Sequence, residues 1–370
     1  MKKLIFTIVS FLSVAVSFSQ IMPLTLEPDG GNKKASISEQ IGIVKIAIAY
    51  SRPGVRGREG KIWNTPVAHY GFADQGHGTS YAAPWRAGAN ENTTMSFSLP
   101  VTIEGNLLPA GTYGFFIALG EKESTLIFSK INNSWGSFYY DSTQDALRVK
   151  VKNDELDESV EWLKYEFTDE TPSSAVIAMS WEKKRIPFKV EAGVQKLQIE
   201  SFKSELRTTR PFYDFMAAAN YCIANNIELA QALAWMDRAI YFRIMGVKNF
   251  QTLGTKAAVL MKLNRTGEAK KIMDEAIPMG TVNEVHFYAR NLLNAKETKE
   301  AFKVFKLNYE KFPNVYTTNI GMGRAHSALG EYKKALGFIK AALPQAPDEG
   351  SKTRTEAMIK KLEEGKDINE

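Results

Sequence analysis

Arginine, tryptophan and glycine gather in one stretch of this sequence, and this mixture suits the binding of an anion. A guanidinium group offers a planar fork of donors that matches a carboxylate or a phosphate. Glycines between the arginines would let the backbone approach such an anion, and flat aromatic faces suit sugars and cyclic ligands. The candidate ligand-binding residues are Arg52, Arg56, Arg58, Trp85, Arg86, Asn90, Glu91 and Tyr113.

The same arginines also have a structural interpretation, and we favour it. They could pair with Glu59, Asp74 and Glu91 and so fasten a long loop to the neighbouring sheet. The stretch from Arg52 to Gly88 is rich in glycine and polar groups. A loop of this length in a compact domain is usually functional or partly disordered.

A second candidate site lies inside the same loop. His69, Asp74 and His77 are residue types that ligate metals, and a zinc ion needs three or four such ligands. Their spacing matches no strong metal motif, so we favour ordinary solvated or hydrogen-bonding histidines. We therefore predict no metal and no cofactor, and keep these three residues as weak metal candidates.

The chain carries no sequence motif typical of a known catalytic class. It lacks a Gly-x-Ser-x-Gly elbow and the glycine motifs of nucleotide-binding loops. A pair of glycosidase carboxylates cannot be placed from sequence. The single cysteine, Cys222, lies in an alanine-rich apolar stretch, where a buried and inert thiol is expected. We rank binding or scaffolding above catalysis, and whether the protein is an enzyme stays open.

The elements that must position these residues in the front half are strands. Apolar residues take every second position in the segments 44–50, 95–99, 147–151, 163–167 and 175–181. A period of two sends one set of side chains inward and the other into water. Turn signals separate the runs, and the spacing predicts an all-β, mostly antiparallel sandwich or barrel.

Several motifs of the front half resemble a known family. They are Tyr50-Ser51-Arg52-Pro53-Gly54-Val55-Arg56-Gly57-Arg58, Ile62-Trp63, Pro84-Trp85-Arg86-Ala87-Gly88-Ala89-Asn90-Glu91, Pro109-Ala110-Gly111-Thr112-Tyr113-Gly114, Trp135-Gly136, Trp181-Glu182 and Pro187-Phe188.

The family these motifs resemble is an uncharacterised secreted bacterial family known as domain of unknown function 2911. The resemblance covers roughly residues 23 to 191. It implies an exported β domain, often found before helical repeats, and it implies no established activity. The stretch between Trp63 and Trp85 is longer here than in the family pattern, so a site built on this loop is in doubt as a family feature.

The hydrophobic period changes from two to three or four near residue 195, which predicts helices. After this point, pairs of small residues recur in which the two members are seven positions apart. In each pair, a large residue stands four positions after the first small residue. The three-residue sets are Ala232, Met236, Ala239; Ala269, Met273, Ala276; Ala301, Phe305, Asn308; and Ala335, Ile339, Ala342.

These sets follow one another at intervals of 37, 32 and 34 residues, and the pattern resembles tetratricopeptide repeats of about 34 residues. Small side chains let antiparallel helices approach, and the large residue fills the space between them. Stacked helix pairs form a concave surface, and such surfaces usually bind peptides or other proteins. We predict this type of partner, and the sequence does not identify the groove residues.

The first residues carry two lysines and then a short apolar run that ends in small residues, as in a secretory signal peptide. The predicted organisation is a cleaved signal peptide at 1–19, a β domain at 20–192, a helical connector at 193–211, helical repeats at 212–350 and a helix end with a frayed tail at 351–370. The protein is expected to be exported, either periplasmic or secreted, with no transmembrane segment after cleavage.

Three functional hypotheses follow. The first is an envelope binding or scaffold protein that holds a protein or peptide on its repeats. The second is an envelope enzyme, such as a hydrolase, or a small-ligand binder that uses the loop 52–91. The third is a structural role without a ligand. The formal net charge of +6 is mild for 370 residues and gives no case for nucleic acid binding.

Overall fold

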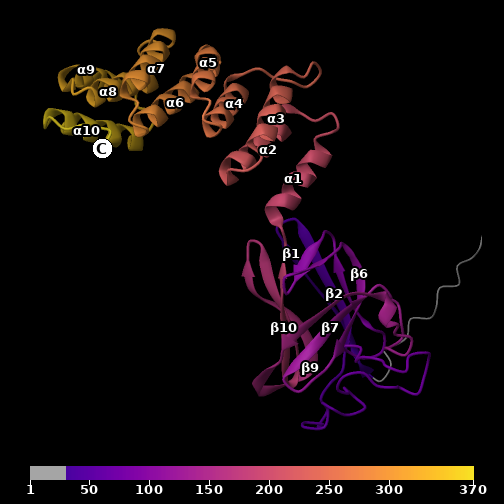
Figure 1. Cartoon of the computed structure of the whole chain (residues 1–370). Coiled ribbons are helices and arrows are strands. Elements are labelled where there is room, and N and C mark those ends of the chain that lie inside the picture. The colour runs from indigo at the N-terminus through magenta and orange to yellow at the C-terminus, as the bar shows by residue number, and fades with distance from the viewer. Residues whose placement is uncertain (1–30) are drawn as a thin grey trace, which may run out of the picture. The chain divides into compact units, whose positions relative to one another are not determined.

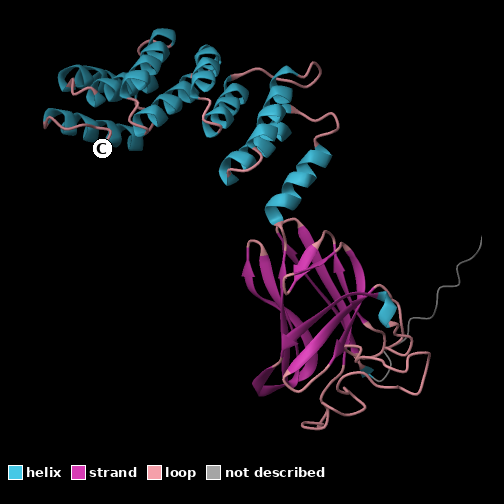
Figure 2. Cartoon of the chain, viewed as in Figure 1, coloured by secondary structure: helices cyan, strands magenta, loops and turns pink. Residues whose placement is uncertain are grey.

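The computed structural model describes residues 31–370, which divide into two compact units with a boundary at Leu197 and Gln198. Figure 1 shows the chain coloured by residue number, and Figure 2 shows that the strands belong to the first unit and almost all of the helix to the second. The predicted order, a β domain followed by a helical array, is confirmed. The predicted signal peptide lies outside the described residues.

The first unit, here called the β unit, contains two antiparallel sheets. One has the strand order β1-β2-β3-β6-β7-β8, and the other has the order β5-β4-β10-β9. The strands are β1 (Lys33–Ile41), β2 (Val44–Arg52), β3 (Thr93–Phe97), β4 (Val101–Ile103), β5 (Asn106–Leu108), β6 (Gly111–Ala118), β7 (Glu123–Ser129), β8 (Asp145–Lys152), β9 (Asp154–Thr171) and β10 (Ser174–Glu191).

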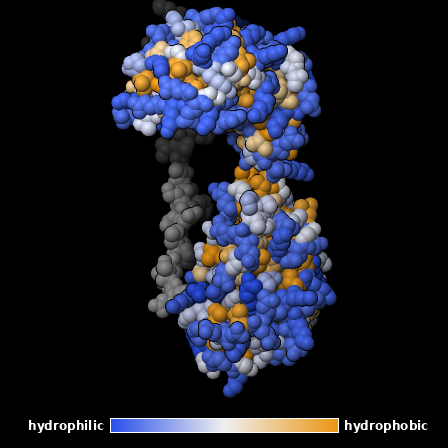
Figure 3. Space-filling model, turned by 90° about the vertical axis from the view of Figure 1, so that its left-hand side faces the viewer, coloured by the Kyte–Doolittle hydropathy of each residue, from blue (hydrophilic) through white to orange (hydrophobic). Residues whose placement is uncertain are grey.

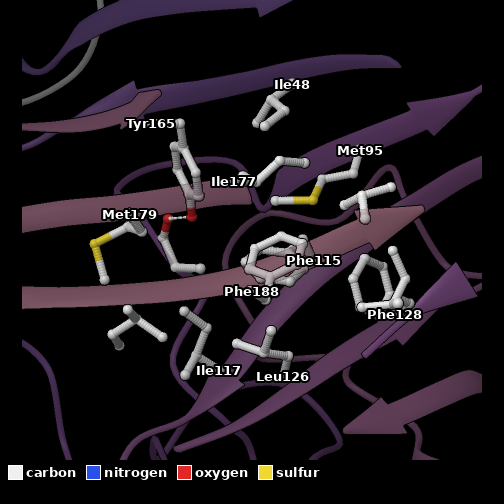
Figure 4. Packing of buried hydrophobic residues seen from close by; sticks show 14 of the residues in the cluster. Ile48, Met95, Phe115, Ile117, Leu126, Phe128, Tyr165, Ile177, Met179 and Phe188 are labelled. Carbon is white, nitrogen blue, oxygen red and sulfur yellow. Dashed lines mark hydrogen bonds between the residues drawn. The ribbon is translucent and has the colours of Figure 1, made fainter. Parts of the chain in front are cut away.

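Strand alternation places the core between the two sheets. In β2 the apolar residues Val44, Ile46 and Ile48 are fully buried, while the residues between them are exposed. Phe115 of β6 and Phe188 of β10 come from different sheets, and their rings stack with centroids 5.8 Å apart. Figure 4 shows these two rings at the centre of the packed side chains. The antiparallel sandwich is therefore held by one shared apolar layer.

The strand β1 has no counterpart among the alternating segments identified in the sequence. Its inward positions include the small Ala35 and the half-buried Ile37, while its other residues are mostly polar or charged. A strand at the edge of a sheet needs little apolar surface, because only one neighbour covers it. β1 pairs with β2 along its whole length, and these backbone hydrogen bonds hold it in the sheet although few of its side chains are apolar.

The second unit, here called the helical unit, consists mainly of antiparallel helix pairs. Its helices pack as α2 with α3, α4 with α5, α6 with α7 and α8 with α9. The bounds are α1 (Val194–Glu205), which begins before the boundary, α2 (Phe212–Asn225), α3 (Leu229–Tyr241), α4 (Phe250–Lys262), α5 (Thr266–Ala276), α6 (Val282–Asn294), α7 (Thr298–Lys311), α8 (Tyr316–Ala328), α9 (Tyr332–Ala342) and α10 (Glu349–Glu363).

The small–large–small sets lie on the second helix of each pair, and every member is buried. Asn308, which stands where the other repeats have alanine, donates from Nδ2 to the carbonyl oxygen of Val282 at 2.8 Å. A buried amide is tolerated when it finds such a partner. The repeat prediction is confirmed, and the asparagine ties α7 to the start of α6.

The predicted frayed tail is wrong for the last residues. Ile368 is only 6% exposed and packs in a cluster with Ile320 and Leu362. Its backbone N–H donates to Ser327 Oγ at 3.1 Å, and Asn369 Nδ2 donates to the carbonyl oxygen of Arg324 at 3.0 Å. One apolar residue among polar ones gives no periodic signal, so only the tertiary contacts with α8 reveal that this segment is held.

The apolar residues exposed on the surface are mostly scattered. Figure 3 shows them among hydrophilic residues on the face of each unit that is turned to the viewer. Single exposed apolar side chains are normal in folded proteins. Among residues 31–370, no helix combines the length and apolar character that crossing a membrane requires.

His286 of α6 is a buried titratable group in the helical unit. Its ring lies against Phe305 with centroids 5.4 Å apart. Burial, and then the positive charges of Arg324 and Arg290, lower the pKa of His286 to about 4. The folded protein therefore holds this imidazole neutral at a pH where the unfolded chain, with a pKa near 6.5, binds a proton.

We expect the helical unit to lose stability as the pH falls from about 6.5 to about 4, because only the unfolded chain gains a proton at His286 in that window. The loss should approach about 3 kcal/mol. Denaturant unfolding of the wild type and of His286→Gln across this range measures it, and the variant should show a shallower slope. His77→Gln, at an exposed position, serves as the control. Equal slopes in all three proteins would contradict the assignment.

Candidate functional site

The arginines of the loop donate to backbone carbonyls. Arg52 Nε donates to the carbonyl oxygen of Leu163 in β9 at 2.8 Å. Arg58 donates to the carbonyl oxygens of Val55 at 3.0 Å and Gly54 at 2.7 Å. The chain from 53 to 55 also pairs with β9, because Val55 N donates to Glu161 O at 2.8 Å and Leu163 N to Pro53 O at 3.1 Å. These contacts brace the start of the loop.

Arg56 lies on the outer side of the same turn, in a left-handed backbone conformation. Its Nη2 donates to the carbonyl oxygen of Gly31 at 3.0 Å, and its guanidinium carbon lies 5.7 Å from the centroid of the Trp162 ring. Lys33 Nζ lies 4.7 Å from the same ring. The Trp162 ring therefore makes cation–π contacts with both Lys33 and Arg56. Through these contacts, and the bond from Arg56 to Gly31, the beginning of the described chain is linked to β9.

Arg86 and Asn90 form a second group at the other end of the loop. Arg86 Nη1 donates to the carbonyl oxygen of Asn90 at 2.9 Å, and its guanidinium lies over the ring of Phe138. Burial lowers the pKa of Arg86. A side chain at Gly136 would meet the Arg86 guanidinium carbon at 2.7 Å, so this glycine makes room for the guanidinium.

The carboxylate of Glu91 forms an ion pair with a lysine of β1. Lys34 Nζ of β1 lies 2.7 Å from Glu91 Oε1, and Ser51 Oγ donates to Glu91 Oε2 at 3.4 Å. The hydrogen bond from Lys34 is the main cause that lowers the pKa of Glu91. The carboxylate therefore stays ionised and bound to a lysine, and it does not join Arg52 or Arg86 in a shared site.

The two aromatic candidates are part of the core. Trp85 is buried and stacks on Trp181 with an interplanar angle of 7°. Tyr113 is also buried, and its hydroxyl donates to the carbonyl oxygen of Pro109 at 2.9 Å. Neither offers an open face to a ligand. The geometry favours the bracing interpretation, but with backbone carbonyls as the main partners in place of the expected Glu59 and Asp74; the ligand-binding role stays a prediction.

The histidine candidates do not converge on one point. His77 is exposed beside Phe138, and Asp74 accepts a hydrogen bond from Gly76 N at 2.8 Å within its own turn. His69 is half-buried, and burial is the main cause that lowers its pKa. Within residues 31–370, no three His, Cys, Asp or Glu side chains come together in a way that could hold a metal ion.

Sequence reasoning missed two buried charged residues on β10, Glu182 and Lys184. Glu182 sits between two irregularities in the pairing with β9 and has a left-handed backbone conformation. Its Oε2 accepts hydrogen bonds from Trp63 Nε1 at 2.9 Å and Lys183 N at 2.8 Å. Lys184 Nζ donates to Glu121 O at 2.8 Å and lies over the Trp63 ring. Each charged group therefore has polar partners, and the bond from Trp63 to Glu182 fixes the loop to the sheet.

A large hollow in the helical unit is a cleft between the pair α4–α5 and the pair α6–α7. Its volume is about 910 Å³, which falls within the range of about 300–1,000 Å³ for ligand sites. The apolar side chains that define it are Phe250, Ala258, Met261, Met273, Phe287 and Tyr288. We call this hollow the inter-pair cleft.

The helix stack is loosened at this cleft. α6 packs closely on α7 and α8, and α4 packs on α2, α3 and α5, but contacts of α6 with α4 and α5 are few. The apolar core consequently divides here, and Phe250 and Tyr288 contact both parts. Their rings meet edge to face, with centroids 6.5 Å apart. Gly280 allows this, because a side chain there would meet the Phe250 ring at 2.8 Å.

Charged side chains surround the apolar floor of the inter-pair cleft. The carboxylates are Asp274, Glu284, Glu297 and Glu300, and the ammonium groups are Lys262 and Lys270. Lys270 Nζ lies 2.6 Å from Glu300 Oε1. The neighbouring pair Phe287-Tyr288 was a usable sequence signal, because adjacent side chains on a helix point in different directions, and Phe287 is indeed exposed.

Together the two units define the class of protein, a β sandwich followed by an array of helix pairs of the tetratricopeptide kind. Residues 32–190 match the model of the family described as protein of unknown function (DUF2911). The resemblance expected from the motifs is therefore confirmed for the β unit.

Solved structures with a similar part include YrrB, described as a TPR protein with an unusual peptide-binding site. It is 18% identical, with a TM-score of 0.28, over 42% of this chain and 79% of that chain. A mutant of MamA is 12% identical, with a TM-score of 0.27, over 42% of this chain and 94% of that chain. No curated protein matches this chain.

Proposed function

We propose that this protein is an exported binding scaffold whose helical unit holds a segment of another protein in the inter-pair cleft. The observation that carries the proposal is the large apolar cleft, about 910 Å³, at the place where the helix pairs are loosened. Stacked helix pairs present extended surfaces of this kind to partners. The charged and apolar opening of the sequence supports export.

Exposed apolar side chains at the cleft would favour the binding of a partner segment, because the partner would remove them from water. Met261 is 49% exposed and Phe287 is 59% exposed, although both line the cleft. Fully burying a side chain of this size stabilises a complex by about 1.5–3 kcal/mol. A partner segment that covers both would gain much of this energy, because the cleft exists before the partner arrives and little reorganisation opposes binding.

The alternative of an enzyme or small-ligand site at the loop 52–91 has weaker support. Arg52, Arg58 and Arg86 all donate to backbone carbonyls, and the Trp85 and Tyr113 side chains are buried. These groups already have partners within the β unit. We assign that unit no chemistry.

The test is to fill the cleft. Ala258 is a half-buried lining residue, and Ala258→Trp would place an indole in the space that the partner needs. Peptides are first selected from a random library displayed on phage, with the full chain as bait. Their affinities for Ala258→Trp should fall about tenfold or more, because the new ring excludes them from the apolar floor.

Ala341→Trp is the matched control, because it makes the same change at an exposed position of α9. Far-UV circular dichroism and the unfolding midpoint must first show that both variants are folded. Selected peptides that bind both variants as tightly as the wild type would overturn the proposal, and so would a selection that yields no binding peptide.

A further inference from the structure

We infer that the segment held by the inter-pair cleft carries a lysine or arginine beside a large apolar residue. This inference rests on the proposed function and specifies its partner. The apolar residue would occupy the floor between α4 and α6, and the cation would lie among the carboxylates at the ends of α5 and α7.

The charge balance of the lining is the first argument. Four carboxylates and two ammonium groups line the cleft, so the charged lining is acidic although the whole chain is basic. The Lys270–Glu300 pair removes one charge of each sign, and Lys303, which lies outside the lining, is 4.0 Å from Asp274. The Glu297 side chain forms no hydrogen bond or ion pair with residues 31–370. Its carboxylate is therefore available to a cation from a partner.

The second argument is that several carboxylates act on one point inside the cleft. Burial raises the pKa of Tyr288, and the charges of Glu297, Asp274 and Glu300 raise it further. The tyrosine ring bridges the two parts of the core, so the negative potential reaches the edge of the apolar floor. A cation at this edge would be attracted by the carboxylates and by the face of the ring.

The two arguments together exclude an acidic segment as the preferred occupant. A carboxylate of the partner would meet the like charges of Glu297 and Asp274 at the edge of the cleft, and this repulsion opposes its binding. A wholly apolar segment would leave Glu297 without a counter-ion. A basic side chain next to an apolar one satisfies both parts of the lining.

The test uses an array of immobilised synthetic peptides in which each neighbour of a central tryptophan or leucine is varied over all residue types. The full chain should prefer lysine or arginine over glutamine beside the apolar residue, and glutamate should be the least favourable. Glu297→Gln should weaken binding of the basic peptides about threefold to tenfold. Added salt should weaken the same peptides.

Glu356→Gln is the matched control, because Glu356 is an exposed carboxylate of α10 outside the cleft. This variant should bind the array as the wild type does. If Ala258→Trp abolishes binding but the bound peptides show no preference for a basic residue, the charge inference fails and the scaffold proposal stands. If no peptide binds in a way that depends on Ala258, both fail.

Discussion

Replacing Trp181 by alanine should lower the free energy of unfolding of the β unit by about 3–5 kcal/mol. The Trp181 side chain is fully buried, stacks on Trp85 and meets Trp63 edge to face with centroids 5.7 Å apart. Removing the indole leaves a hole between these rings, and the sheet cannot close over it without moving Trp85, which is bridged to Ile117 of β6. The loop would lose its support at the same time.

Tryptophan fluorescence during denaturant unfolding measures this effect, because Trp235 is the only tryptophan beyond residue 197. The control is Trp135→Ala, which removes an indole that is 46% exposed in the same unit. It should change the unfolding midpoint far less. If Trp181→Ala and Trp135→Ala have the same unfolding midpoint, the aromatic cluster does not hold the β unit together.

Replacing Phe305 by alanine should cost the helical unit a similar amount, about 3–5 kcal/mol. Phe305 is the large member of the third repeat set, is nearly completely buried, and lies between His286 of α6 and Gly321 of α8. A side chain at Gly321 would meet the phenyl ring at 2.6 Å, so ring and glycine are matched in shape. Their joint packing leaves little freedom to refill a cavity.

The change is followed by the loss of far-UV circular dichroism, because helices give most of that signal. Leu307→Ala on the same helix is the control, since Leu307 is 42% exposed and its truncation opens no internal cavity. Phe305→Ala should lower the midpoint of the helical transition and leave the fluorescence transition in place, because the two clusters share no residue. A shift of both transitions together would contradict separate cores.

The binding proposals depend on a different part of the helical unit from these stability tests. Phe305 belongs to the core of α6 to α8, while Ala258 and Glu297 line the inter-pair cleft. Variants of the cleft should therefore change peptide affinity with little change in the unfolding midpoint. This separation is what makes a loss of binding interpretable as a loss of the site.

The sequence by itself determined the two fold classes. Alternation such as Val44, Ile46 and Ile48 predicts a strand with one buried face, and the spacing of Ala335, Ile339 and Ala342 predicts a packed helix. Both patterns arise from local backbone geometry, a period of two or of about 3.6, so a single segment displays them without knowledge of its neighbours.

Only the tertiary structure decided the partners of the charged and aromatic groups. The sequence placed Arg52, Trp85 and Glu91 in one loop. In the fold, Arg52 donates to a carbonyl of β9, Trp85 stacks on a core tryptophan, and Glu91 pairs with a lysine of β1. The inter-pair cleft likewise follows from the packing of whole helices, because α6 makes few contacts with α4 and α5. Contacts between segments far apart in the chain depend on how whole elements pack, and residue spacing carries no record of that packing.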